Sequence, residues 1–149
     1  MPTVTMTREY AIDRKALFDH LTDPATWSSY YASLTEVDVP DRFDEPGHRA
    51  ALRYRVLGRI VDVQAELLEH DPPNRFRTRA TSSGLPPVEH DWRYEETDDG
   101  TKLTVTLTSQ EVDSWLGRAL DRFVLPHQLE SDLARTLDHV EGLVEFGLH

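Results

Sequence analysis

Apolar and polar residues alternate along most of the first 109 positions. Short runs with a period of two are typical of strands that bury one face and expose the other. The pattern predicts strands over residues 3–10, 34–39, 51–57, 59–69, 75–81, 88–96 and 102–108. Clusters of Pro, Gly, Asp and Asn separate these runs, and they predict turns or loops over residues 40–47, 71–74, 82–87 and 98–100.

Two short helices are expected between the first two strands. Asp13 is placed to cap the first, in which Leu17, Phe18 and Leu21 face inward. Asp23 precedes Pro24, which is the preferred order for a cap followed by the first helical residue. The aromatic residues of the second helix follow at helical spacing: Trp27, Tyr30 and Tyr31.

The C-terminal part of the chain changes to helical spacing. Over residues 113–148 the apolar positions are Leu116, Leu120, Phe123, Leu133, Leu137, Val140 and Val144. Pro126 removes one backbone donor, so a kink or a fresh start is expected near residues 124–126. The charged residues of the regular part are expected on the outside: Glu130, Asp132, Arg135, Asp138, His139 and Glu141.

Charge on the polar faces of the strands predicts their order. The outward positions carry arginines at 53 and 55, acids at 62 and 66, arginines at 75, 77 and 79, and acids at 89, 91 and 95. If consecutive strands pair, each basic row lies beside an acidic one, and such cross-strand pairs contribute about 0.2–1 kcal/mol each. The alternative, that the three arginines bind an anion, is less consistent with this regular alternation.

Composition narrows the class of protein. A chain of 149 residues fits a single domain over residues 1–149. Its net charge of -11 argues against nucleic acid or an anionic membrane surface as the main partner. The sequence has no cysteine, so thiolate chemistry and disulfides are excluded. No signal peptide or membrane-spanning run is evident, so a soluble, cytoplasmic protein is expected, as a monomer or homodimer.

Other chemical motifs are missing from the sequence. The seven histidines are scattered without the spacing of a zinc site, and no metal or other cofactor is expected. No glycine-rich loop opens a helix, which removes the usual phosphate site. The serines have no context that indicates a catalytic triad.

Several short segments, taken in order, resemble a known family. They are residues 16–24 with Trp27, Pro46-Gly47, Gly58-Arg59, residues 69–73, residues 99–102 and residues 130–137. With the order of elements, they make the chain similar to the START/Bet v 1-like (SRPBCC) superfamily, and within it to the bacterial polyketide cyclase/dehydrase and lipid-transport group. The resemblance covers nearly the whole chain.

The resemblance implies an α+β helix-grip fold. In it a curved antiparallel sheet of about seven strands, two short helices and a long C-terminal helix enclose a cavity for hydrophobic ligands. The family has no universal catalytic motif, so no catalytic residue follows from the resemblance.

Candidate site residues come instead from the inward faces. His90, His127 and Tyr54 are the candidates for proton transfer, because each carries a polar group into apolar surroundings. The candidates for ligand contact are Trp92, Tyr94, Phe76, Val63, Leu52, Phe123 and Leu120. Each histidine has an alternative interpretation as a core residue bonded to the backbone. Leu85 and its neighbouring prolines are candidates for a cavity lip.

Three functions remain open at this point. The first is a protein that binds a hydrophobic small molecule such as a polyketide, a lipid or an aromatic metabolite. The second is a cofactor-independent polyketide cyclase, aromatase or dehydratase that uses a cavity histidine or tyrosine as general acid or base. The third is a protein-interaction module that uses the charged face of the sheet.

Overall fold

A seven-stranded antiparallel sheet and three helices make up the described part of the chain. The computed structural model describes residues 3–56, 58–83, 85–109 and 125–147. The strands are β1 (Thr3–Tyr10), β2 (Leu34–Asp38), β3 (Arg49–Val56), β4 (Arg59–Asp71), β5 (Arg75–Ser82), β6 (Leu85–Thr97) and β7 (Gly100–Ser109). The helices are α1 (Arg14–Leu21), the 3₁₀ helix η1 (Pro24–Ser29) and α3 (Leu125–Glu145).

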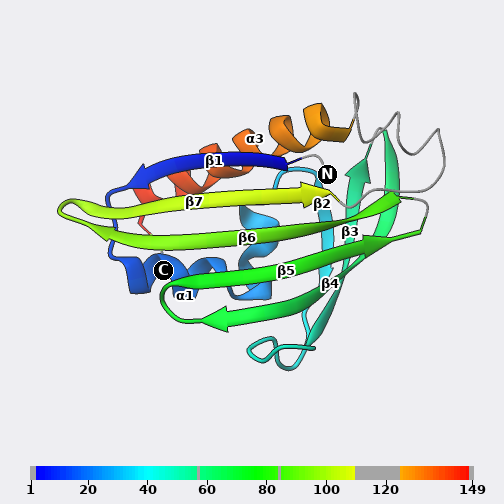
Figure 1. The fold of residues 1–149 in the computed structure, drawn as a ribbon, viewed down its shortest axis with the longest axis horizontal. Helices are drawn as coiled ribbons and strands as arrows, with labels where there is room; N and C mark the ends of the chain where they lie inside the picture. Colours follow the sequence, from blue (N-terminus) through cyan, green and yellow to red (C-terminus); the bar gives the residue numbers. More distant parts are fainter. Residues whose placement is uncertain (1–2, 57, 84, 110–124, 148–149) are drawn as a thin grey trace.

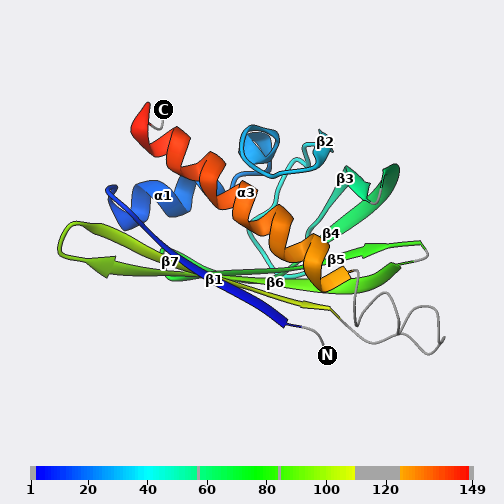
Figure 2. The same ribbon diagram turned by 90° about the horizontal axis from the view of Figure 1, so that it is seen from above.

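The strands pair in the order β1-β7-β6-β5-β4-β3-β2 (Figure 1). From β2 to β7 each strand therefore lies beside its successor in sequence, and β1 closes the order beside β7. For β3 to β6 this is the order that the charge pattern predicts. Figure 2 shows α1, η1 and α3 on one side of the sheet, with α3 crossing the strands obliquely. The inward face of the sheet is thus the face that the helices cover.

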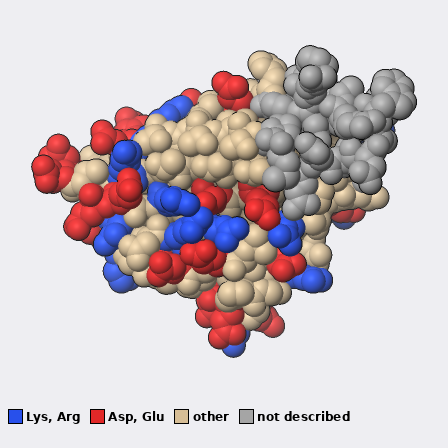
Figure 3. Space-filling model, in the orientation of Figure 1, with Lys and Arg blue, Asp and Glu red and all other residues tan. Residues whose placement is uncertain are grey.

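Ion pairs on the opposite face confirm the predicted alternation of charge. Arg53 lies 3.4 Å from Glu36 of β2 and 3.2 Å from Asp62 of β4. Arg77 lies between acids of β4 and β6 in the same way, 3.5 Å from Glu69 and 3.7 Å from Glu89. Figure 3 shows the arginines as a row across this face with acidic side chains on both sides. A slip of one residue in any pairing would turn these charges inward, so the ladder helps to fix the register.

The two short helices begin where the sequence predicts. The Asp13 side chain accepts a hydrogen bond from the Ala16 amide at 3.2 Å, and Asp23 accepts one from the Ala25 amide at 3.0 Å. Each bond satisfies an amide that has no partner within its helix. The second element is a 3₁₀ helix, after which Tyr30 is buried.

The predicted loop over residues 82–87 is partly wrong. Strand β6 already begins at Leu85, and Ser82 pairs with Leu85 while Ala80 pairs with Val88. Two steps along β5 therefore face three along β6, which is a bulge. Pro86 and Pro87 lie at this bulge, where a strand tolerates residues that lack an amide hydrogen.

The terminal helix is described from Leu125 onward. Pro126 is its second residue, a position where a missing amide hydrogen breaks no helical bond. Leu133, Leu137 and Val140 are buried against the sheet, as their spacing predicts. The remainder of the predicted helical stretch, residues 113–124, lies outside the described residues. No helix in the ranges that the structure describes is long and apolar enough to cross a membrane.

Candidate ligand-binding pocket

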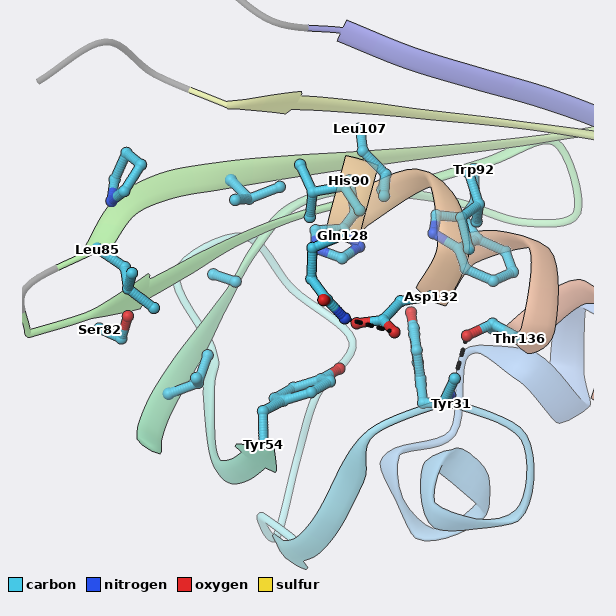
Figure 4. Close-up of a pocket in the computed structure, with 17 residues that line it drawn as sticks. Tyr31, Tyr54, Ser82, Leu85, His90, Trp92, Leu107, Gln128, Asp132 and Thr136 are labelled. Atoms are coloured by element: carbon cyan, nitrogen blue, oxygen red, sulfur yellow. Dashed lines mark hydrogen bonds between the residues drawn. The ribbon is translucent and has the colours of Figure 1, made fainter. Parts of the chain in front are cut away.

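A pocket of about 130 Å³ lies between the inward face of the sheet and α3. Strands β3 to β7 form its floor, α3 covers it, and the segment between η1 and β2 closes one side (Figure 4). Most of the lining is apolar. The lining residues are Tyr31, Ala32, Tyr54, Val63, Ala80, Ser82, Leu85, Pro86, Val88, His90, Trp92, Leu107, Gln128, Leu129, Asp132, Leu133 and Thr136.

Four of the residues predicted to face a ligand or transfer a proton line this pocket: His90, Tyr54, Trp92 and Val63. Leu85 and Pro86 line it as well, in agreement with the predicted lip, although they belong to a strand. The alternation of β3, β4 and β6 was sufficient to place these side chains on the inward face.

Three further candidates face inward but lie in the core beyond the pocket: Tyr94, Phe76 and Leu52. For Tyr94 and Phe76 the reason is helix α1. Phe18 of α1 lies against the rings of Tyr94 and Phe76, with centroid distances of 5.0 and 6.4 Å. Packed aromatic side chains thus occupy this part of the inward face, and the pocket is confined to the part that α3 covers.

The prediction that His127 faces the cavity is wrong. Its side chain is exposed at the start of α3, and it is not part of the pocket lining. Gln128 and Leu129, the next two residues of the helix, line the pocket instead. A difference of one residue rotates a side chain by about 100° around a helix, so small errors in phase matter here. Phe123 and Leu120 lie outside the described residues.

His90 stands in the middle of β6 between two neighbouring strands. Thr78 of β5 and Leu107 of β7 are its cross-strand partners. Burial lowers the pKa of His90 to about 4, so the imidazole is neutral near pH 7. No described residue forms a hydrogen bond with it. A neutral imidazole offers one donor and one acceptor, and the described residues use neither.

Two tyrosine hydroxyls enter the pocket from the side opposite His90. Tyr54 comes from β3 and Tyr31 from the segment after η1, and Figure 4 shows both hydroxyls turned toward Asp132. Burial raises the pKa of each phenol well above its usual value, and the charge of Asp132 adds to the effect at Tyr54. Both hydroxyls therefore stay protonated at neutral pH. The Tyr54 hydroxyl forms no hydrogen bond with a described residue.

Asp132 lines the pocket, which corrects the expectation that it lies outside. Its Oδ1 atom accepts hydrogen bonds from Ser33 Oγ at 3.2 Å, Gln128 Nε2 at 3.0 Å and Arg135 Nη2 at 2.5 Å. Its side chain is 23% exposed. Sequence reasoning missed Asp132 because charged residues on a helix usually face solvent.

A signal for this helix face does exist in the sequence. Gln128, Asp132 and Thr136 follow one another at intervals of four and therefore share one face of α3. This row runs directly beside the apolar positions Leu133, which is buried, and Leu129, which is partly buried. Polar residues in such a row border the core and can reach an internal pocket.

The segment that carries Tyr31 is fixed to α3 by hydrogen bonds. The Ala32 amide donates to Thr136 Oγ1 at 2.9 Å, and Ser33 Oγ donates to Asp132. Ser33 has a φ of 68°, in the left-handed region that few non-glycine residues adopt. The Ser33 carbonyl accepts a bond of 2.7 Å from the Arg55 amide, which helps to hold this turn and so the position of Tyr31.

The arrangement suits recognition of a small molecule with apolar and polar parts. The polar groups provide donors and acceptors on two opposite sides of the pocket, with aliphatic and aromatic side chains between them. Within the described ranges, no three His, Asp or Glu side chains gather closely enough to hold a metal ion.

Comparison with known proteins identifies the family. The family model described as polyketide cyclase / dehydrase and lipid transport matches residues 1–145. The chain belongs to this family. A search of the curated proteins finds no match.

Solved structures show the same fold. TTHA0849 from Thermus thermophilus superposes with a TM-score of 0.78 at 20% identity, covering 99% of this chain and 100% of that one. Ara h 8.0201, a Bet v 1-like protein, superposes with a TM-score of 0.73 at 16% identity, covering 97% and 98% of the two chains. DynU16, described as a putative protein in the dynemicin biosynthetic locus, superposes with a TM-score of 0.69 at 16% identity. The match covers 97% of this chain and 48% of the DynU16 chain. The α+β helix-grip fold is thereby confirmed.

Proposed function

We propose that this protein binds a compact, mainly apolar small molecule in the pocket between the sheet and α3. The observation that carries the proposal is the pocket itself, about 130 Å³ with apolar walls and a few inward polar groups. Ligand sites typically have this composition. The family, whose description names polyketide cyclases and lipid transport, supports a ligand-binding or cyclase role.

The volume suggests the size of the ligand. An apolar cavity of about 150 Å³ in another protein accommodates benzene. A single ring or a short chain is therefore the part of a ligand that this pocket encloses without rearrangement. Toluene is a suitable probe because it has this size and no polar group.

Filling the pocket tests the proposal. Ala80 lines the pocket, and Ala80→Leu adds three carbon atoms to its wall. We expect the affinity for toluene to fall by at least about tenfold, because the leucine occupies the space of the ligand. Titration followed by two-dimensional NMR measures this affinity.

The control uses the same substitution on the other face. Ala51 of β3 is exposed, and Ala51→Leu should bind toluene as the wild type does. The proposal fails if the wild-type protein does not bind toluene, or if Ala80→Leu binds it with unchanged affinity.

A second candidate function is acid–base catalysis of a cyclisation or dehydration. The observation in its favour is His90, a neutral imidazole in the pocket wall whose two nitrogens have no hydrogen-bond partner among the described residues. A base can remove a proton from a carbon beside a carbonyl group. The enolate then attacks a second carbonyl of the same molecule, and the new alkoxide takes up the proton.

Heptane-2,6-dione tests this second candidate, since its cyclisation and loss of water give an absorbing enone. If His90 is the base, wild-type protein accelerates enone formation, and His90→Gln reduces the acceleration by about 100-fold or more. The rate should be constant above pH 5 and fall as His90 is protonated near pH 4. His127→Gln, at an exposed position, is the control. Acceleration that survives in His90→Gln excludes His90 as the base.

A further inference from the structure

The polar groups in the pocket differ in how fully the protein satisfies them. Asp132 Oδ1 receives three hydrogen bonds, from Ser33, Gln128 and Arg135. Asp132 Oδ2 receives none from the described residues, although the residue lines the pocket. The Asp132 side chain is 23% exposed. Its Oδ2 atom can therefore accept a hydrogen bond from a molecule in the pocket without losing one from a described residue.

Two tyrosine hydroxyls point toward the Asp132 carboxylate without donating a hydrogen bond to it. Tyr31 and Tyr54 both turn toward Asp132 in Figure 4, yet neither forms a hydrogen bond with the carboxylate. The three groups come from the segment after η1, from β3 and from α3, which are far apart in the sequence. Their shared direction places one carboxylate and two hydroxyls on the same side of the pocket.

Charge in the pocket restricts what that group can be. Among the residues that the structure describes, no lysine or arginine lines the pocket. The charge of Asp132 is already compensated by Arg135, whose side chain is 55% exposed outside the pocket. An anionic ligand would be repelled by the carboxylate, and a cationic one would add a second positive charge beside Arg135 at the same carboxylate. An uncharged donor avoids both costs.

We propose that Asp132 selects an uncharged ligand with a hydroxyl on a compact ring or short chain, and that this hydroxyl donates to Asp132 Oδ2. The hydroxyl oxygen then accepts a hydrogen bond from Tyr31 or Tyr54. The apolar part of the ligand lies toward Leu85 and Val88. Asp132 is thus a specificity-determining residue of the pocket, and this inference rests on the proposed binding function.

Phenol and toluene form the test pair, because they have nearly the same shape and differ in one hydroxyl. Comparing each ligand between wild type and Asp132→Asn cancels the difference in their hydration. We expect Asp132→Asn to lower the affinity for phenol by about tenfold, because a hydrogen bond to a charged acceptor is stronger than one to a neutral acceptor. Toluene should bind both proteins with the same affinity. NMR titration measures all four affinities.

Asp138→Asn is the matched control. Asp138 lies on the same helix and also pairs with an arginine, Arg8, at 2.7 Å, but it does not line the pocket. Its substitution should leave both affinities unchanged. A loss of phenol affinity in both variants would indicate a general effect on α3 and would overturn the assignment to Asp132.

Benzoate tests the charge argument in the wild-type protein, so the proposal does not depend on whether Asp132→Asn folds. Benzoate should bind at least about tenfold more weakly than phenol. Equal or tighter binding of benzoate overturns the proposal.

The two proposals fail in different ways. If toluene binds but Asp132→Asn leaves the affinity for phenol unchanged, the proposed role of Asp132 is wrong and the proposed binding function stands. If neither toluene nor phenol binds to the wild type, both proposals fail.

Discussion

Single residues in this protein derive their properties from what packs around them. His90 is an ordinary strand residue by its position, yet its cross-strand neighbours and the pocket remove most of the water that would stabilise its charge. Asp132 is an ordinary helix residue, yet it lines the pocket. Both are candidates for function because a polar group is held in a largely apolar place.

The lowered pKa of His90 predicts a pH dependence of stability. The pKa of His90 is about 4 in the folded protein, against 6.5 for an unperturbed histidine. Between these values the unfolded chain binds the extra proton and the folded chain does not. The free energy of unfolding therefore decreases as the pH falls from 6.5 to 4, by up to about 1.4 kcal/mol per pH unit from this residue.

Urea denaturation at several pH values measures this slope. His90→Gln has no titrating group at the site, so its stability should depend less on pH between 6.5 and 4 than that of the wild type. His127→Gln, at an exposed position, should keep the wild-type slope. Equal slopes in wild type and His90→Gln would show that His90 is protonated as easily in the folded as in the unfolded chain.

At the scale of elements, neighbouring segments of the chain meet through close backbone contacts as well as through side chains. Gly100 begins β7 beside the end of β1. A Cβ atom at Gly100 would lie 2.1 Å from the Tyr10 carbonyl oxygen and 2.9 Å from the Ile12 amide nitrogen. Only glycine allows this approach of two backbones.

Two glycine substitutions should therefore have effects of opposite sign. Gly100→Ala should lower the free energy of unfolding by about 3 kcal/mol, because backbone atoms must move to admit the new carbon. Gly142 of α3 has no atom within 4 Å of an added Cβ, so Gly142→Ala should raise stability by up to about 1 kcal/mol through helix propensity. Chemical denaturation measures both, and a tolerated Gly100→Ala would contradict the close contact.

The packing of helices on the sheet also explains why some predictions from the sequence were wrong. Alternation places Tyr94 and Phe76 on the inward face as reliably as it places Trp92. It does not reveal that α1 packs on the first two while α3 covers the region of the third. The prediction of a loop at residues 82–87 was partly wrong for a related reason. Prolines predict a break in a strand, but the bulge lets β6 continue through them.

For the whole molecule, the sheet is a single curved layer with two kinds of cover on one face. One part of that face is closed by aromatic packing from α1 and η1, where Phe18, Trp27 and Tyr30 are buried. The other part lies under α3 and contains the pocket. A packed aromatic region thus stands beside a region with space for a ligand, so the fold can be both stable and able to bind.

The sequence by itself determined the strands, the charge ladder that sets their order, the caps of the two short helices and the apolar stripe of α3. These features depend on residues close together in the chain, or on periodicity that holds for any partner. Only the tertiary structure decided where the pocket lies, that Asp132 enters it and that His127 does not. Those outcomes depend on which distant segments pack against each other around α3.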